Sequence, residues 1–249
     1  MDDVAIISGG LGDIGRAIAM ELARRGADIA IGDILPPAAA TPVLADISAL
    51  GRRGRYDRVD VSEPDEVETW VSSVEASLGL PTLIIPNAAI VTEANLRQMT
   101  PAQWRQELNV NLDGAFHLAQ AGAERLVARK RPGRIVFIGS WAGHAPHAYI
   151  PAYCVAKAGL RMLMKLMALE FARDGILVNE VAPGYVDGGL SGREFERDPA
   201  FRKRSIEEVP IHRLIETSDV ALQVAHLCDP RNQHMTGSVV LMDGGLSLR

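Results

Sequence analysis

Short runs of β-branched and aliphatic residues alternate along this chain with longer segments of helical periodicity. Seven such runs occur, at residues 4–8, 28–32, 55–61, 82–86, 134–139, 176–182 and 238–243. Helical segments lie between them, near residues 14–25, 64–78, 101–130, 152–173 and 217–228, and the Pro/Ala stretch at 35–42 indicates a loop. Nearly continuous apolar strands that alternate with helices are typical of a parallel sheet covered by helices on both faces. The sequence therefore predicts an α/β fold, a doubly wound parallel sheet of about seven strands.

The length of the chain and one irregular segment indicate how this fold is organised. The 249 residues are compatible with one large domain, and we expect a single domain over 1–249. The pattern is interrupted between Gly184 and Pro210, where the chain is polar and rich in Gly, Arg and Glu. A connection of this length inside a compact domain is typical of a binding loop, so we expect a substrate lid at about 184–212.

Composition excludes several classes of protein. The chain is 47% hydrophobic with a net charge of −5, which argues against disorder and leaves no basic surface for nucleic acid. Its two cysteines cannot form a disulfide framework. The first residues are acidic where a secretory signal is basic, and no apolar stretch approaches the length of a membrane span. We therefore expect a cytoplasmic protein without a membrane or nucleic-acid partner.

A glycine-rich turn joins the first strand to the first helix. It reads SGGLGDIG over residues 8–15. Glycines at such a turn allow the backbone to approach a ligand closely, and the helix N-terminus offers free N–H groups to a phosphate. Its position in the first βαβ unit indicates a dinucleotide site of the Rossmann type.

An acidic residue ends the second strand, as this kind of site requires. Asp33 lies 18 residues after Gly15. A carboxylate there accepts hydrogen bonds from the ribose hydroxyls of the cofactor and repels a 2′-phosphate. Because neither Gly10 nor Leu11 is basic, the sequence favours NAD over NADP.

A serine, a tyrosine and a lysine form the candidate chemical centre. Tyr153 and Lys157 are spaced i, i+4 and share one face of a helix, while Ser140 ends the strand at 134–139. A phenol is too weak an acid to serve as a base at neutral pH, but a nearby ammonium group lowers its pKa. The phenolate can then take a proton from an alcohol while hydride leaves the carbon, with Ser140 orienting the same oxygen.

Taken together, these motifs resemble the short-chain dehydrogenase/reductase family over nearly the whole chain. The family's TGxxxGxG turn matches residues 8–15, its NNAG motif matches 86–89, and its Ser-x12-Tyr-x3-Lys spacing is complete. Four further segments match family motifs: the Asp-Val pair at 60–61, LNVNLDGAF, the Pro-Gly pair at 183–184 and MTGSVVLMDGG.

The resemblance implies a role for each matching residue. Tyr153 is then the general acid/base, Lys157 lowers its pKa and binds the nicotinamide ribose, Ser140 positions the substrate, and Asn111 holds a water in a proton relay with Lys157. The implied cofactor-binding residues are Gly9, Leu11, Gly12, Asp13, Ile14, Gly15, Asp33, Asp60, Val61, Asn87, Tyr153, Lys157, Pro183, Gly184 and Val186. The resemblance also implies a homotetramer.

This chain departs from the family pattern at three places. Asp13 stands where the middle glycine of the turn is usual. Pro86 and Ala89 alter the fourth-strand motif but leave Asn87 unchanged. Gly188 and Gly189 stand where a threonine near the carboxamide is common. All four catalytic positions are retained, so we expect an active enzyme.

The residues between Ser140 and Tyr153 are expected to border the substrate. His144 and His147 belong there, so the substrate-binding set is Ser140, His144, His147 and Tyr153. The two histidines have no evident third ligand, so no metal is expected.

These features predict an NAD-dependent oxidoreductase that interconverts a secondary alcohol and a ketone. Hydroxyl, imidazole and guanidinium groups near the pocket and a low aromatic content favour a sugar or polyol substrate. One alternative on the same scaffold is a 3-oxoacyl-thioester (acyl carrier protein) reductase, supported by the arginines of the 184–212 segment. An alternative of another class is a non-catalytic NAD-binding scaffold or regulator.

Overall fold

A computed structural model describes residues 3–248 and contains one seven-stranded parallel sheet with the order β3-β2-β1-β4-β5-β6-β7. This confirms the predicted doubly wound α/β fold. The strands are β1 (Val4–Ser8), β2 (Asp28–Asp33), β3 (Gly54–Arg58), β4 (Pro81–Ile85), β5 (Gly133–Ile138), β6 (Ile176–Pro183) and β7 (Val239–Met242).

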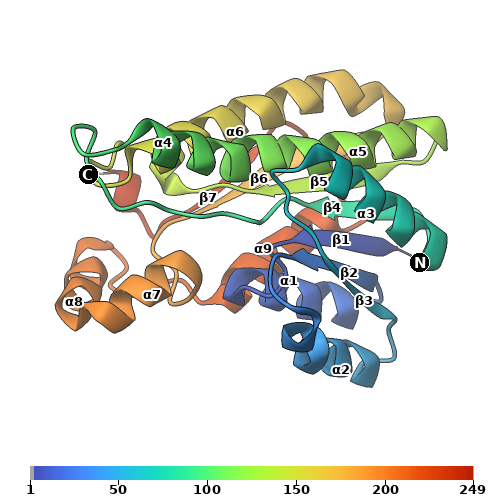
Figure 1. Ribbon diagram of the computed structural model, residues 1–249, viewed down its shortest axis with the longest axis horizontal. Helices are drawn as coiled ribbons and strands as arrows, with labels where there is room; N and C mark the ends of the chain where they lie inside the picture. Colours follow the sequence, from blue (N-terminus) through green and yellow to red (C-terminus); the bar gives the residue numbers. More distant parts are fainter. Residues whose placement is uncertain (1–2, 249) are drawn as a thin grey trace.

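Helices cover both faces of the sheet (Figure 1). They are α1 (Asp13–Arg24), α2 (Thr41–Ala49), α3 (Pro64–Ser77), α4 (Pro101–Leu108), α5 (Gly114–Ala128), α6 (Pro151–Phe171), α7 (Gly189–Arg197), α8 (Pro199–Glu208) and α9 (Thr217–Cys228). Helices α3 to α6 pack on one face, while α1, α2 and α9 pack on the other. Each face has its own apolar core, and the central strand β1 is buried along its whole length.

The direction of winding reverses between β1 and β4. The chain runs outward from β1 to β3, and then from β4 to β7 on the other side. The carboxyl ends of β1 and β4 therefore flank a switch point, which is where sheets of this kind bind ligands.

Three local predictions were wrong. The Pro/Ala stretch at 35–42, expected to be a loop, contains the 3₁₀-helix Pro37–Ala40 and the start of α2. The single helix expected over 101–130 is divided into α4 and α5 by the π-helical turn Asn109–Asp113. The expected strand over 55–61 ends at Arg58.

The 184–212 segment is mostly helical. Its polar sequence forms α7 and α8, which stand apart from the sheet beyond the carboxyl end of β6 (Figure 1). No helix within residues 3–248 is both long enough and apolar enough to cross a membrane.

Candidate active site

Ser140, Tyr153 and Lys157 meet at the carboxyl edge of the sheet. Ser140 follows β5, and the other two lie one turn apart near the start of α6. The Lys157 Nζ lies 5.5 Å from the centroid of the Tyr153 ring, and the Ser140 hydroxyl is near enough to the phenol to lower its pKa. Segments far apart in sequence thus place a hydroxyl, a phenol and an ammonium group together.

Burial governs the acidity of this centre. It raises the pKa of Tyr153 to about 12, although the hydrogen bond from Ser140 acts in the opposite direction. Burial also lowers the pKa of Lys157 to about 8, against the attraction of Glu180. The sequence predicted that Lys157 would lower the pKa of the phenol, whereas here desolvation dominates and the pKa is raised. The Lys157 ammonium group instead donates to the Ile138 carbonyl at 2.8 Å.

Asn111 belongs to the same centre but uses its side chain to hold a loop. It is fully buried in the π-helical turn between α4 and α5. Its Oδ1 accepts from the Ile90 N–H and its Nδ2 donates to the Ile90 carbonyl, both at 2.8 Å. The amide thus makes one hydrogen bond at each end to the same residue, and it fixes the loop after β4 against the π-helical turn.

The glycine-rich turn is shaped for close contact with a ligand. Gly9 has a φ of +61°, and a Cβ there would lie 2.8 Å from the Ala88 Cα. A Cβ on Gly15 would lie 2.3 Å from the Gly9 carbonyl oxygen. Gly12 precedes α1 without any side-chain cap, so the first N–H groups of that helix remain available to an anion. These features fit the pyrophosphate of a dinucleotide.

Asn87 fastens this turn to the end of β4. Its Nδ2 donates to the carbonyls of Ser8 and Gly9, each at 2.9 Å. The Ser8 Oγ in return accepts from the N–H groups of Asn87 and Ala88. Asn87 therefore positions the turn from across the switch point.

Asp33 lies beside the turn, as its position at the end of β2 predicts. Its Oδ2 accepts from the Leu11 N–H at 3.1 Å, and its Oδ1 accepts from the Leu35 N–H at 3.3 Å. The carboxylate is thus held next to the outer side of the glycine-rich turn. No basic side chain pairs with it among the salt bridges of residues 3–248.

The remaining predicted cofactor residues lie along the same edge. Asp60 caps the following turn through Ser62, and Val61 is buried against Gly114, where a Cβ would lie 2.6 Å from the Val61 Cγ2. Pro183 ends β6, and Val186 is buried and bridged to Ile215. Ile14 packs on the apolar core beneath α1, and the N–H of Gly184 donates to the Met242 carbonyl.

Two of the three departures from the family pattern contact each other. The Asp13 Oδ2 accepts from the Gly189 N–H at 2.8 Å. A Cβ at Gly188 would lie 3.4 Å from the Asp13 Cβ and 2.8 Å from the Thr217 Cγ2. Gly188 therefore allows close packing on Thr217, and the hydrogen bond from Gly189 to Asp13 connects the glycine-rich turn to the start of α7.

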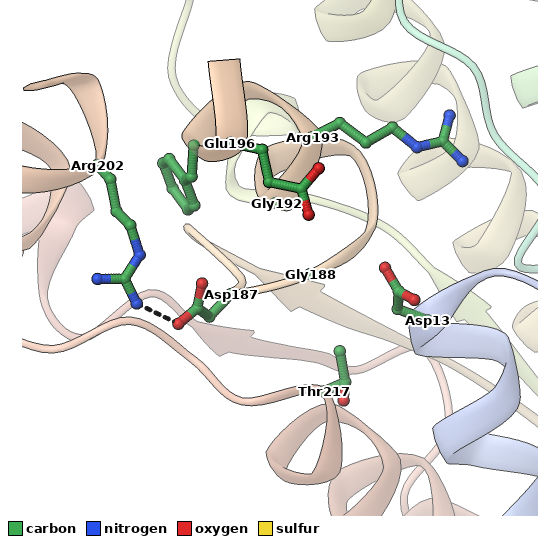
Figure 2. A pocket seen from close by; sticks show the side chains of 9 residues that line it. Asp13, Asp187, Gly188, Gly192, Arg193, Glu196, Arg202 and Thr217 are labelled. Carbon is green, nitrogen blue, oxygen red and sulfur yellow. Dashed lines mark hydrogen bonds and ion pairs between the residues drawn. The ribbon is translucent and has the colours of Figure 1, made fainter. Parts of the chain in front are cut away.

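This contact borders a cavity of about 430 Å³ below α7. Figure 2 shows the carboxylates of Asp13, Asp187 and Glu196 around it, with Arg202 paired to Asp187. Arg193 also lines the cavity, but its guanidinium points to one side. No group of three or more His, Cys, Asp or Glu side chains within 3–248 is arranged to hold a metal ion.

The two histidines predicted at the substrate wall differ in their surroundings. His147 packs edge-on against Trp141, with ring centroids 4.3 Å apart, and its Nε2 is buried without a hydrogen-bond partner. His144 is exposed in the same loop. Burial lowers the pKa of both imidazoles.

An aromatic cluster beside this wall was not predicted. Tyr185 packs on Trp141 at 5.5 Å and on Phe201 at 5.9 Å, and Phe195 adjoins both Tyr185 and Phe201. It connects the Ser140 loop to α7 and α8. The signal in the sequence was the Tyr and two Phe residues within an otherwise polar segment.

A buried acid near the phenol was also missed. Glu107 on α4 has no exposed surface, and its Oε2 accepts from the Thr92 N–H at 3.0 Å. Its Oε1 has no partner, and burial raises its pKa. Its position four residues before Asn111, and so on the same helix face, was the available signal.

The fold and this edge define a dinucleotide-binding α/β protein with a Ser-Tyr-Lys centre. A family model described as enoyl-(acyl carrier protein) reductase matches residues 10–247. The chain is 32% identical over 243 residues to the 3-oxoacyl-(acyl-carrier-protein) reductase FabG of Pseudomonas aeruginosa, covering 98% of this chain and 96% of that one.

Solved structures agree with these matches. Acetoin dehydrogenase YohF from Salmonella typhimurium superposes with a TM-score of 0.90 at 32% identity, over 100% of this chain and 97% of that one. A protein from Agrobacterium tumefaciens with bound NADP, provisionally assigned as a 2-deoxy-D-gluconate 3-dehydrogenase, has a TM-score of 0.90 at 28% identity over 99% and 97%. The chain belongs to the short-chain dehydrogenase/reductase family. Its members are oxidoreductases that use a nicotinamide cofactor.

Proposed function

We propose that this protein is an NAD-dependent dehydrogenase that interconverts a secondary alcohol and a ketone. The observation that carries the proposal is the meeting of Ser140, Tyr153 and Lys157 at the sheet edge that holds the glycine-rich turn. Bound at this edge, NAD would supply the acceptor for the hydride that leaves the carbinol carbon. The proposed domain is the whole chain, 1–249, with 184–212 as a lid over the substrate.

Each side chain has a defined part in the proposed proton transfer. The Tyr153 oxygen takes the proton of the alcohol in oxidation and returns it in reduction. The Lys157 ammonium group, 5.5 Å from the Tyr153 ring, is the cation proposed to offset the desolvation that raises the pKa of the phenol. Ser140 donates to the substrate oxygen and fixes its orientation. Asn111 keeps the loop after β4 in place through Ile90.

The cofactor preference follows from Asp33. Its carboxylate lies beside the turn, and within residues 3–248 no Lys or Arg side chain is paired with it. A 2′-phosphate there would be repelled, whereas two ribose hydroxyls would donate to the carboxylate. The A. tumefaciens relative was solved with NADP, so turnover is compared with both cofactors.

For the substrate we propose a sugar or polyol. The exposed His144 and the buried, unpartnered Nε2 of His147 are hydrogen-bonding groups in the loop between Ser140 and Tyr153. The second candidate is a 3-oxoacyl-thioester reductase, which is supported by the similarity to FabG along almost the whole chain. A third reading, of another class, is a non-catalytic NAD-binding scaffold or regulator.

The experiment is NADH formation from NAD across a panel of sugars, polyols, hydroxy acids and aliphatic or steroidal alcohols. The panel is repeated with NADP, and a 3-oxoacyl thioester is tested with NADPH. Tyr153→Phe serves as the matched blank, because it removes only the phenolic oxygen. Turnover with NAD that disappears in Tyr153→Phe supports the proposal. Reduction of the thioester with NADPH alone supports the second candidate, and cofactor binding without any turnover supports the scaffold.

We also propose a homotetramer. The outer face of α6 exposes apolar side chains, including Met162, Leu166 and Leu169, the last 80% exposed. Burial of such a face between copies would remove it from water. Light scattering on the purified protein measures the oligomeric state directly, and a monomer at micromolar concentration would exclude the tetramer. The cytoplasmic location stays a prediction of the sequence.

A further inference from the structure

An ion pair lies buried beside Ser140. Glu180 on β6 has no exposed surface, and the side chain of Arg161 on α6 is 11% exposed. The Arg161 Nε donates to Oε2 of Glu180 at 2.9 Å, and Nη2 donates to Oε1 at 2.8 Å. Burying two charges has a desolvation penalty that apolar residues of similar volume do not have. A contribution to the stability of the fold is therefore a weak explanation for the buried Arg161–Glu180 pair.

The pair also contacts the candidate active site. Arg161 follows Tyr153 and Lys157 at further intervals of four residues, so the three share one face of α6. Its Nη2 donates to the Ser140 carbonyl at 3.2 Å. One guanidinium group therefore joins α6 and β6 to the main chain of Ser140, whose hydroxyl lies beside the phenol.

Gly139 shows how closely the carboxylate approaches this backbone. A Cβ at position 139 would lie 1.9 Å from the Glu180 Oε1. The carboxylate thus occupies the space beside the residue that leads into Ser140. The Ser140 carbonyl also accepts from the Gly143 N–H at 3.0 Å, so its peptide is held from two sides.

We propose that Arg161 and Glu180 are positioning residues for the reaction, which together hold the Ser140 main chain so that its hydroxyl stays aligned with the Tyr153 oxygen. The inference rests on the proposed dehydrogenase function. Arginine suits this task because its planar fork makes the bidentate contact and still reaches the carbonyl, whereas lysine offers a single ammonium group.

The test compares a double variant, Arg161→Met with Glu180→Met, with Arg161→Lys. The double variant removes both charges and keeps the volume, so the folded state retains no unpaired charge. We expect its Tm to stay near that of wild type and its NADH Kd to change less than about twofold. Its kcat should fall about 10- to 100-fold, since small misplacements of reacting groups have effects of this order. Arg161→Lys should fold normally and lose part of the kcat.

The matched control is an arginine–glutamate ion pair between α5 and α3. Arg125 on α5 makes a bidentate contact with Glu68 on α3, and Arg125→Lys should leave kcat unchanged. Wild-type kcat in a stable double variant would overturn the inference, because the pair would then be purely structural. If the double variant does not fold, wild-type kcat in Arg161→Lys overturns it, and a reduced kcat with unchanged NADH affinity supports it. Failure of the proposed function is separate, since the wild type would then show no turnover or a turnover that survives Tyr153→Phe.

Discussion

Replacing Lys157 by methionine should make this protein more stable while abolishing its turnover. Lys157 is 2% exposed, and burial lowers its pKa from the usual 10.5 to about 8. That difference corresponds to a penalty of about 3 kcal/mol for holding a charged ammonium group in the folded state at pH 7. Methionine fills a similar volume without a charge.

The gain in the free energy of unfolding is reduced because the variant loses one hydrogen bond. The Ile138 carbonyl accepts from the Lys157 ammonium group at 2.8 Å, and losing this donor costs about 1 kcal/mol. A net stabilisation of about 2 kcal/mol remains, which for a chain of this size raises Tm by about 4 to 8 °C. Hydride transfer should be lost because no cation is left to stabilise the Tyr153 phenolate.

The sign of the pH dependence identifies the cause. Below pH 8, Lys157 is protonated in both the folded and unfolded states, so the wild type carries the whole penalty. Between pH 8 and 10.5 the unfolded chain binds more protons than the folded one, so the free energy of unfolding of the wild type rises with pH. Because the penalty falls by about 1.4 kcal/mol per pH unit above pH 8, the advantage of Lys157→Met should vanish near pH 9.5 and reverse by about pH 10.5.

Urea unfolding followed by circular dichroism at pH 7, 9 and 10.5 measures this difference. Lys165→Met is the matched control, because Lys165 is exposed on the same helix and its replacement should shift stability by less than about 0.5 kcal/mol. A Lys157→Met variant that is less stable than wild type at pH 7, or a difference that does not change with pH, would refute the reasoning.

Three further changes test other parts of the site. Asn87→Ala removes the two hydrogen bonds to the carbonyls of Ser8 and Gly9, so it should lower the free energy of unfolding by about 2 to 4 kcal/mol. It should also weaken NADH binding in a fluorescence titration, and an unchanged NADH affinity would contradict this role. Asp33→Ser should raise the ratio of kcat/KM with NADP to kcat/KM with NAD at least about tenfold, because the carboxylate that repels the 2′-phosphate is removed. An unaltered ratio would show that Asp33 does not set the cofactor preference. Burial raises the pKa of Glu107, so its favourable contribution is present at low pH and lost as pH rises through that pKa. Glu107→Gln should therefore gain Tm relative to wild type between pH 4 and pH 8, and equal Tm differences at the two pH values would contradict the assignment.

Local patterns in the sequence were sufficient for the framework of the site. The apolar runs predicted the parallel strands, because strands buried on both faces must be apolar along their length. In a parallel sheet, the residues that come directly after each strand lie at the same edge of the sheet. Asp33 and Ser140 could therefore be placed at this edge from the chain alone, and the i, i+4 spacing put Tyr153 and Lys157 on one helix face.

The same reasoning failed where local signals were weak or misleading. The alanines after Pro36 carry little amphipathic pattern, so the stretch at 35–42, which contains the 3₁₀-helix Pro37–Ala40 and the start of α2, was predicted to be a loop. The polar segment around α7 and α8 forms helices because Tyr185, Phe195 and Phe201 pack together, a contact between residues up to 16 positions apart. The π-helical turn at Asn109–Asp113 interrupts a helix whose periodicity continues on either side.

The sequence by itself thus determined the fold class, the edge of the sheet that holds the site, and the residue types at its centre. Only the tertiary structure decided their energetics and their partners. Desolvation, which raises the pKa of Tyr153 and lowers that of Lys157, depends on how many atoms from distant segments surround each group. The contacts of Asp13 with Gly189 and of Arg161 with Glu180 join elements that meet only after the sheet has assembled. Such pairs leave no periodic pattern in the chain, because their spacing is set by packing and not by the repeat of a helix or a strand.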